Sequence, residues 1–305
     1  MRVGITGASG FIGTALVSAL SARGDTVVAF VRPGGPTRPG PTVRWDPERH
    51  LIDDTDWRRE GHLDAVVNLA GAGIADRRWT EERKRAILSS RVSSTALLVE
   101  ALREAPGGAP FLASASAVGY YGSRGDEVLT EQSASGGDFL ARVCRQWEDE
   151  ARSLSAVGAG VATLRTGIVL SARGGALAAQ LHLFRAGLGG RLGTGDQWLS
   201  PITLADLVRA ILFVVDRRLE GPVNLVGPYA VTNRAFTSAL ARTLHRPALL
   251  PVPRWALRLA LGAELADGAV LASQRVSPRG LLASGFTFRH DEISTALRIA
   301  VADRG

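Results

Sequence analysis

The chain has 305 residues, of which 46% are hydrophobic and 21% charged, a composition that excludes wholesale disorder and predicts two domains or one large domain with an appendage. Its single cysteine, Cys144, excludes a disulfide framework. The net charge of +7 rests on 35 arginines and one lysine spread along the whole chain, which favours dispersed surface charge over nucleic-acid binding.

The N-terminal residues are predicted to form two strands with a helix between them. Residues 2–6 are apolar and β-branched and are followed at once by glycines, which predicts a buried strand. Residues 11–22 have helical periodicity, and residues 26–31 read as a second buried strand. Residues 33–62 are the most irregular part of the sequence, with a possible short strand at 43–45.

The alternation of strands and helices continues to residue 164. Strands are predicted at 64–69, 111–115 and 161–164, and helices at 80–103 and 139–154. Such alternation is typical of βαβ units with right-handed crossovers, so the fold class is α/β with a doubly wound parallel sheet.

After residue 170 the alternation weakens. Glycines cluster at 187–195, a helix is predicted at 204–215, and one more strand at 223–226. The last 55 residues are predicted to be mostly helical, with breaks at prolines.

A glycine-rich loop lies between the first strand and the first helix. Its sequence is Thr6-Gly7-Ala8-Ser9-Gly10-Phe11-Ile12-Gly13. The first glycine permits a tight turn, the second lets the backbone approach a pyrophosphate, and the third allows the helix to pack closely on the strand. The helix N-terminus then faces the anion. In this strand–loop–helix context the loop predicts a dinucleotide-binding, Rossmann-like fold.

Further motifs follow along the chain. They are Asn68-Leu69-Ala70-Gly71, Arg78-Trp79-Thr80, Arg91-Val92, Ser114-Ala115-Ser116-Ala117-Val118-Gly119-Tyr120-Tyr121-Gly122, Trp147-Glu148, Arg165-Thr166-Gly167-Ile168-Val169-Leu170, Gly195-Asp196-Gln197-Trp198, Ser277-Pro278-Arg279, Leu281-Leu282 and Gly285-Phe286-Thr287-Phe288. With them, essentially the whole chain resembles the extended, epimerase/dehydratase-like form of the short-chain dehydrogenase/reductase superfamily. More narrowly, it is similar to epimerase-family proteins with an uncharacterised C-terminal helical domain.

The resemblance implies a set of cofactor-binding residues and a division into domains. The implied cofactor contacts are Thr6, Gly7, Ser9, Gly10, Phe11, Ile12, Gly13, Asn68, Leu69, Ala70, Gly71, Arg165 and Thr166. We expect residues 1–170 with about 203–226 to form the dinucleotide-binding Rossmann domain. Residues 171–202 with 227–305 are expected to form a smaller, mainly helical substrate domain over the carboxyl edge of the sheet.

The proton-transfer residues of the superfamily are only partly present. In these enzymes a Ser or Thr holds the substrate oxygen, a Tyr is the general acid or base, and a Lys four residues later lowers the pKa of the Tyr. Ser116 matches the first position, but none of the three tyrosines has a lysine four residues on. Counting back from Glu148, the expected lysine falls on Cys144 and the expected tyrosine on Leu140, or on Phe139 with a one-residue shift.

Three functions remain open at this stage. The chain is an oxidoreductase or epimerase with Tyr120 or Tyr121 donating a proton beside Ser116, or it binds a dinucleotide as a non-catalytic redox sensor or scaffold. A sugar-nucleotide dehydratase is disfavoured, because Ala117-Val118 stand where those enzymes place an Asp-Glu pair. The enzyme is favoured over the sensor, since hydride transfer requires little more than two positioned molecules.

The end of the second predicted strand favours NADP(H) over NAD. Proteins that prefer NAD place an acid there to bind the ribose hydroxyls, whereas this chain has Arg32 and no acid before Asp46. A guanidinium pairs bidentately with a 2′-phosphate, and Ser9 in the glycine loop is expected to add a hydroxyl.

Other candidates concern the substrate and the partners. Arg78, Trp79, Gln197 and Trp198 are candidate substrate contacts. The five scattered histidines have no metal-ligand spacing, so no metal site is expected. No signal peptide and no membrane-spanning run is evident, so we expect a cytoplasmic monomer or homodimer that takes a small-molecule substrate and binds neither membrane nor nucleic acid.

Overall fold

An eight-stranded sheet is the centre of the protein in the computed structural model, which describes residues 1–35, 40–248 and 250–303. The strand order is β12-β8-β6-β5-β1-β2-β3-β4. Its strands are β1 (Arg2–Thr6), β2 (Thr26–Val31), β3 (Thr42–Asp46), β4 (Leu51–Ile52), β5 (Ala65–Asn68), β6 (Phe111–Ala117), β8 (Val161–Thr166) and β12 (Gly221–Leu225). All neighbours are parallel except the edge pair β3–β4, so the predicted doubly wound parallel sheet is confirmed.

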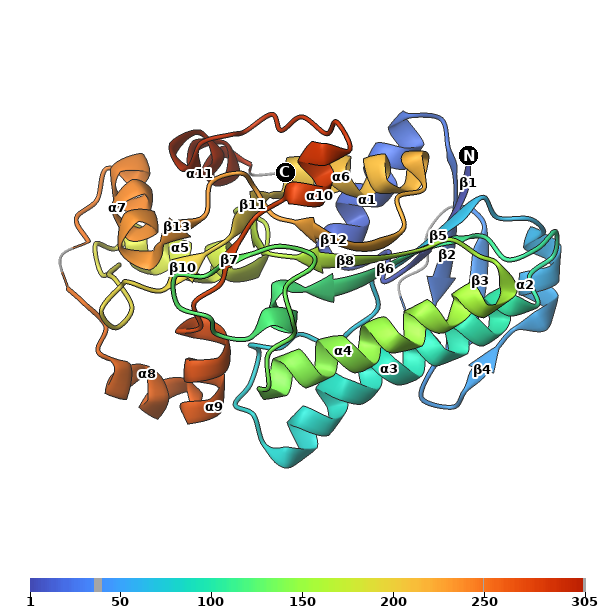
Figure 1. The fold of residues 1–305 in the computed structure, drawn as a ribbon, viewed down its shortest axis with the longest axis horizontal. Coiled ribbons are helices and arrows are strands. Elements are labelled where there is room, and N and C mark those ends of the chain that lie inside the picture. The colour runs from blue at the N-terminus through green and yellow to red at the C-terminus, as the bar shows by residue number, and fades with distance from the viewer. Residues whose placement is uncertain (36–39, 249, 304–305) are drawn as a thin grey trace.

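Helices cover both faces of the sheet (Figure 1). Helices α1 (Phe11–Ala22) and α6 (Leu204–Arg217) pack together on one face, and α3 (Glu81–Arg103) and α4 (Phe139–Arg152) pack together on the other. Leu16 and Leu20 of α1 repeat every four residues, so both point into the first apolar core with the β-branched residues of β1. Leu98 and Leu102 of α3 do the same in the second core. The two buried faces fix the positions of the strand ends.

The register of the central strands brings three polar side chains to one edge. Thr6, the last residue of β1, lies opposite Asn68, the last residue of β5, and Asn68 lies opposite Ser114 of β6. The chain runs from β1 outward to β2 on one side and to β5 on the other, so the topological switch point lies between β1 and β5. Ligands of open α/β sheets bind outside the carboxyl ends of the strands at this point.

The remaining elements gather beyond the end of the sheet toward which β8 runs, at the left of Figure 1. Their helices are α5 (Gly175–Arg185), α7 (Asn233–Leu244), α8 (Arg254–Leu261), α9 (Ala263–Leu265) and α11 (Ile293–Ala302). Helix α10 (Arg279–Ala283) instead lies beside α6 and contacts β12 (Figure 1). Short strand pairs join this region to the rest: β9 (Ile168–Leu170) with β11 (Pro201–Thr203), β10 (Trp198–Leu199) with β13 (Val231–Thr232), and β7 (Val128–Leu129) with β14 (Arg275–Val276). Three single-turn segments are η1 (Val118–Tyr121), η2 (Ser153–Val157) and η3 (Ala266–Val270).

The sequence prediction missed several of these elements. Helix α2 (Asp54–Glu60) lies inside the region predicted to be irregular and is only seven residues long. Its start is nevertheless set by Asp53, whose carboxylate accepts the Asp56 N–H. Helices α5 and α7 were also not predicted. The division into two domains at the stated boundaries stays a prediction. In the described part of the chain, no helix has both the length and the hydropathy needed to cross a bilayer.

Candidate functional site

The glycine loop has a geometry that only glycine allows at two positions. Gly7 has a φ of +65°, and a Cβ there would lie 2.7 Å from the Leu69 carbonyl oxygen. A Cβ on Gly13 would lie 2.2 Å from the Gly7 carbonyl oxygen. The loop therefore folds tightly against the start of α1 and against the chain leaving β5. Gly10, the N-cap residue of α1, offers no capping side chain, so the N–H groups of the first turn are left for an anion.

Thr6 and Asn68 hold the strand ends together beneath this loop. The Thr6 hydroxyl donates to Asn68 Oδ1 at 2.7 Å and accepts the N–H groups of Leu69 and Ala70. Asn68 Nδ2 donates to the hydroxyls of Thr95 and Ser114. Both side chains are fully buried, so they position the loop backbone rather than present groups to a ligand.

Arg32 and Ser9 lie at the same edge with their side chains exposed. Arg32 directly follows β2, which pairs with β1 as far as Thr6 opposite Phe30. Within the described residues the Arg32 guanidinium makes no hydrogen bond or ion pair, and the next acid along the chain is Asp46 in β3. The edge therefore presents a free cation and no carboxylate where a dinucleotide's ribose would lie.

The other residues implied as cofactor contacts differ in exposure. Phe11 and Ile12 are half-buried and pack on the first core, and the Phe11 ring fills the space where Gly174 has no Cβ. Gly71 is exposed, while Leu69 and Ala70 are half-buried. Thr166, also half-buried, donates its hydroxyl to the Leu164 carbonyl.

Ser116 belongs to a buried ionic network. Its hydroxyl donates to Glu148 Oε1 at 2.7 Å, and the Arg165 guanidinium binds the same carboxylate through Nε at 2.8 Å and Nη2 at 2.9 Å. The exposed fractions of Ser116, Glu148 and Arg165 are 4%, 1% and 2%. The hydroxyl proton of Ser116 is therefore donated to Glu148, which leaves this hydroxyl with no proton to donate to a ligand.

Arg165 holds this network together, and its predicted contact with the cofactor stays a prediction. Its Nη1 donates to the Tyr121 hydroxyl and to the Glu131 carbonyl oxygen. Burial opposes the charge of Arg165, but hydrogen bonds and attraction from Glu148 outweigh it and raise the pKa of Arg165. With all three of its nitrogens engaged, this guanidinium has a structural role.

The two candidate tyrosines have different environments. Tyr121 is fully buried and donates to Asn224 Oδ1 at 2.6 Å; burial raises the pKa of Tyr121 to about 12 although Arg165 opposes the rise. Tyr120 is only half-buried, its ring stacks on the Arg165 guanidinium at 3.5 Å, and its hydroxyl has no partner among the described residues. Of the two hydroxyls, that of Tyr120 is free to meet a ligand.

Leu140 and Cys144 occupy the positions at which the superfamily places its Tyr and Lys. Both lie on α4 and face η1, since a Cβ on Gly119 would lie 3.3 Å from Leu140 Cβ and 3.8 Å from Cys144 Sγ. Burial, with repulsion from Glu148, raises the pKa of Cys144 to about 11. An apolar side chain and a neutral thiol thus replace the usual acid and cation.

The candidate substrate residues contact the protein itself. Arg78 donates to the carbonyls of Leu259 and Ala260 at the end of α8, and Trp79 donates to the Ile74 carbonyl. Gln197 donates to the Leu192 carbonyl. Trp198 donates to Asp126 Oδ1 and lies under the Arg275 guanidinium. Of these contacts, that of Arg78 joins α8 to the loop after β5, whereas the bonds of Trp79 and Gln197 are local. The role of the four residues as substrate contacts stays a prediction.

Sequence reasoning did not single out Glu131, Glu148 or Asn224 as members of the site. All three are buried, and Glu131 accepts the N–H groups of Asn224 and Gly280. Glu148 lies on the buried face of α4 with Cys144, Trp147 and Ala151. An acid on the buried face of a helix is the signal that would have found it.

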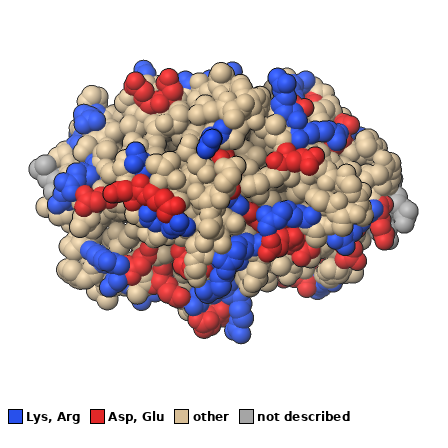
Figure 2. Space-filling view, viewed as in Figure 1, with Lys and Arg blue, Asp and Glu red and all other residues tan. Residues whose placement is uncertain are grey.

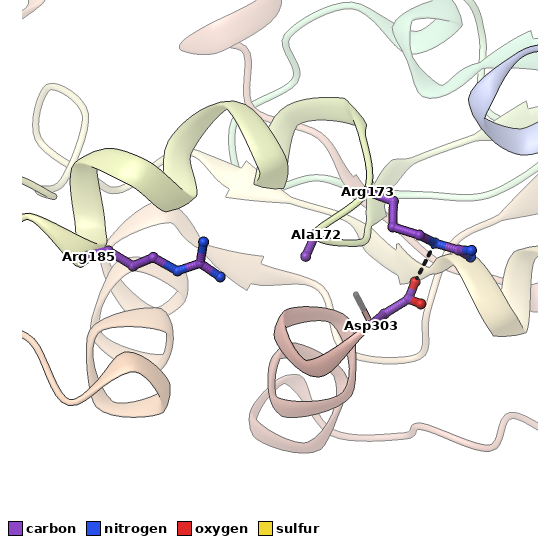
Figure 3. Close-up of a pocket in the computed structure, with 4 residues that line it drawn as sticks. All are labelled: Ala172, Arg173, Arg185 and Asp303. Atoms are coloured by element: carbon purple, nitrogen blue, oxygen red, sulfur yellow. Dashed lines mark hydrogen bonds and ion pairs between the residues drawn. The ribbon is translucent and has the colours of Figure 1, made fainter. Parts of the chain in front are cut away.

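Two cavities of the described residues lie elsewhere. One, of about 490 Å³, is lined by Ala172, Arg173, Arg185 and Asp303, and Figure 3 shows Arg173 paired with Asp303 while Arg185 extends from α5 on the other side. The other, of about 560 Å³, lies between α1, α6 and α11. Neither is lined by the glycine loop, Arg32 or the 68–71 segment. No group of three or more metal-ligating side chains is found among the described residues.

Comparison with known proteins places the chain in a family. Residues 3–227 match the NAD dependent epimerase/dehydratase family, and residues 252–300 match a domain of unknown function, DUF1731. An epimerase family protein of Mycobacterium bovis is 43% identical over 307 residues, covering 99% of this chain and 98% of that protein. An epimerase family protein of Bacillus subtilis is 34% identical over 317 residues, covering 100% and 99%.

Solved structures agree with this assignment. The crystal structure of human epimerase family protein SDR39U1 (isoform 2) with NADPH has a TM-score of 0.87 at 30% identity, covering 99% of this chain and 100% of that one. A nucleoside-diphosphate sugar epimerase from Corynebacterium glutamicum has a TM-score of 0.77 at 35% identity, covering 99% of this chain and 59% of that one. The resemblance inferred from the motifs is confirmed, and the chain belongs to the NAD-dependent epimerase/dehydratase family.

Proposed function

We propose that this protein binds NADP(H) at the carboxyl ends of β1, β2 and β5 and uses it in an oxidoreductase or epimerase reaction on a small molecule. The observation that carries the proposal is the exposed Arg32 guanidinium after β2, with no carboxylate between it and Asp46. The uncapped N-terminus of α1 supports it as a pyrophosphate site. NADPH in the human relative's structure supports the same cofactor.

In this proposal, one set of residues binds the cofactor phosphates and another residue transfers a proton. Arg32 and Ser9 bind the 2′-phosphate, Gly7–Gly13 and the 69–71 backbone hold the remainder of the dinucleotide, and Thr6 and Asn68 fix that backbone. When bound, NADPH supplies hydride-transfer chemistry. Tyr120 then donates a proton from its unpartnered hydroxyl to the substrate oxygen, while Tyr121 and Ser116 remain in the buried network.

Cofactor preference is tested by titrating NADPH and NADH into the wild type and into Arg32→Asp. We expect Arg32 to contribute about 1.5–3 kcal/mol through a charged hydrogen bond, so the variant binds NADPH roughly 10- to 150-fold more weakly and loses its preference over NADH. Arg242→Asp is a matched control, because Arg242 is exposed on α7 and its replacement changes the net charge equally. Equal wild-type affinity for the two cofactors, or an unchanged preference in Arg32→Asp, contradicts the proposal.

A non-catalytic redox sensor or scaffold is the second candidate function. It is favoured by the commitment of Ser116 to Glu148 and by the presence of Leu140 and Cys144 where the dyad is expected. A screen of NADPH oxidation against carbonyl compounds, followed by single-turnover measurements on Tyr120→Phe, separates the two. Enzyme chemistry predicts turnover that falls at least about 100-fold in Tyr120→Phe. NADPH binding without oxidation by any carbonyl compound supports the sensor.

A further inference from the structure

Arg91 of α3 is a partly buried cation with no acidic partner. Its Nη1 donates to the Ile87 carbonyl at 3.1 Å and its Nη2 to the Ala72 carbonyl at 2.9 Å. These bonds use two of the five N–H groups of a guanidinium, and no carboxylate pairs with Arg91 within the described residues. Its surroundings contrast with those of Arg165, whose charge is balanced by Glu148.

The groups around Arg91 do not neutralise it. Asp76, an acid of the neighbouring loop, pairs with Arg83 at 3.1 Å. The Trp147 ring lies 5.2 Å from the guanidinium and offers only its π face. Cys144 also lies near, but its raised pKa keeps the thiol neutral at ordinary pH. Burial is the main cause that lowers the pKa of Arg91, as expected for a cation without a counter-ion.

The guanidinium lies at the carboxyl edge of the sheet. A Cβ on Gly71 would come within 3.2 Å of Arg91 Cζ, so the guanidinium fills the place that a side chain would take at the end of the Asn68–Gly71 motif. Arg91 is on the β6 side of this motif, beside Trp147 and Cys144 of α4. The glycine loop, where the diphosphate is proposed to bind, is on the β1 side. Arg91 is thus placed toward Ser116 and η1, where the reacting end of a bound dinucleotide would be.

We propose that Arg91 binds an oxyanion, a carboxylate or phosphate, that is carried by the small-molecule substrate. This inference rests on the proposed function, since it assigns a chemical class to the substrate of that reaction. A planar guanidinium with free N–H groups matches carboxylate and phosphate oxygens bidentately. A ligand oxyanion supplies the missing counter-charge, and the partly desolvated position strengthens the attraction.

Anion titration of the variants tests the proposal. Inorganic phosphate and malonate are titrated by calorimetry into the wild type, Arg91→Met, Arg91→Lys and the control Arg85→Met, each with and without saturating NADPH. Arg85 is exposed on the same helix. We expect saturable binding of at least one anion to the wild type, at least tenfold weaker binding to Arg91→Met, intermediate binding to Arg91→Lys, and no change in Arg85→Met. Anion binding that is equal in wild type and Arg91→Met, or absent from the wild type, overturns the proposal.

NADPH titration of the same variants separates substrate from cofactor. The affinity for NADPH is expected to stay within about twofold in Arg91→Met; a tenfold loss means that the oxyanion belongs to the cofactor and overturns the assignment to the substrate. Circular dichroism checks the fold, and Arg91→Lys replaces Arg91→Met for both comparisons if the latter is unfolded. A wild type that binds anions at Arg91 but no NADPH refutes the proposed cofactor alone, so the two failures are distinguishable.

Discussion

The buried ion pair of Glu148 with Arg165 occupies the region of Ser116, where the motif predicted catalytic residues. At the end of β6, the Ser116 hydroxyl donates to the Glu148 carboxylate, and this carboxylate pairs with the Arg165 guanidinium. A buried pair is costly to form, and removing one partner leaves an uncompensated charge. Ser116, Glu148 and Arg165 thus join β6, α4 and β8 through hydrogen bonds.

A stability measurement checks this role of the pair. We expect Arg165→Met to lower the free energy of unfolding by about 3–5 kcal/mol, because Glu148 stays buried without its main partner. The double variant Arg165→Met/Glu148→Leu is expected to recover part of that loss. Arg234→Met, which breaks an exposed pair with Asp196, serves as the control and changes stability by less than about 1 kcal/mol. A loss in Arg165→Met no greater than in the control contradicts the structural role.

The raised pKa of Cys144 predicts a pH dependence. Burial raises the pKa of this thiol from 9.0 to about 11, so folding favours the protonated form. The contribution to stability is fully present below pH 9 and is lost as the pH rises toward about 11. Comparison of wild type with Cys144→Ala by urea unfolding at pH 8 and pH 10.5 isolates this term, because other titrating groups are common to both. The wild type should lose more stability than the variant; equal losses contradict the assignment.

Thiol labelling gives an independent check of the same residue. At pH 8 the native protein should react with a disulfide reagent far more slowly than the urea-unfolded protein, since Cys144 is the only cysteine and is buried. Equal rates in the two states would show that the thiol is accessible.

At the scale of elements, the contacts of Arg78 and Lys84 join the α8–η3 segment to the start of α3 and the loop before it. Arg78 binds the last carbonyls of α8, Lys84 pairs with Glu264 of α9 at 2.9 Å, and Gly268 of η3 lies against the Trp79 ring. We expect Arg78→Ala to raise the rate of limited proteolysis within 254–270 about fivefold or more, because local opening becomes easier. Arg77→Ala, an exposed neighbour, is the control. An unchanged cleavage rate in Arg78→Ala contradicts the fastening role.

Sequence patterns predicted the elements that local physics determines. The strands β1, β2 and β5, helix α1 and the turn at Gly7 follow from apolar periodicity and from the backbone that glycine alone adopts. Thr6 and Asn68 were predicted from the family resemblance to contact the cofactor, which stays a prediction. In the structure their side chains hydrogen-bond to each other and join the ends of β1 and β5.

The partners of the catalytic candidates were not predictable in the same way. Ser116 and Glu148 are 32 residues apart, and Tyr121 and Asn224 are 103 apart, so no local pattern shows that they meet. Arg78 was predicted as a substrate contact because it follows the fourth predicted strand, and Trp198 because it lies in a glycine-rich loop. Their hydrogen-bond acceptors in the structure come from α8 and from Asp126. Tertiary pairing decides which polar side chains of a motif keep unused hydrogen-bonding groups. Among the described residues, Tyr120 and Arg32 have no side-chain hydrogen-bond partner, and Arg91 uses only part of its guanidinium.

Over the whole molecule, charge is distributed rather than concentrated. On the face shown in Figure 2, Lys and Arg alternate with Asp and Glu. Many of the arginines pair with acids on the same or a neighbouring element, as Arg258 does with Asp267 and Arg44 does with Asp56. On this face the basic residues form no continuous stripe, because acidic residues lie between them.

The path of the chain predicts that ligand binding stabilises the molecule as one unit. After β8 the chain passes through α5 and returns for β12, which pairs with β8 in the central sheet, while β9 pairs with β11 and β7 with β14. The segment with α5 is therefore held at both ends by strands of the central sheet, and the C-terminal helices are joined to the rest of the chain through the β7–β14 pair. We expect a single thermal transition, and NADPH at about 100 times its Kd should add about 2.7 kcal/mol of stability. For a chain of this size that shifts Tm by a few degrees, and Arg32→Asp should abolish most of the shift at the same NADPH concentration. Calorimetry measures both. Two separate transitions, of which NADPH moves only one, would show instead that the halves unfold independently.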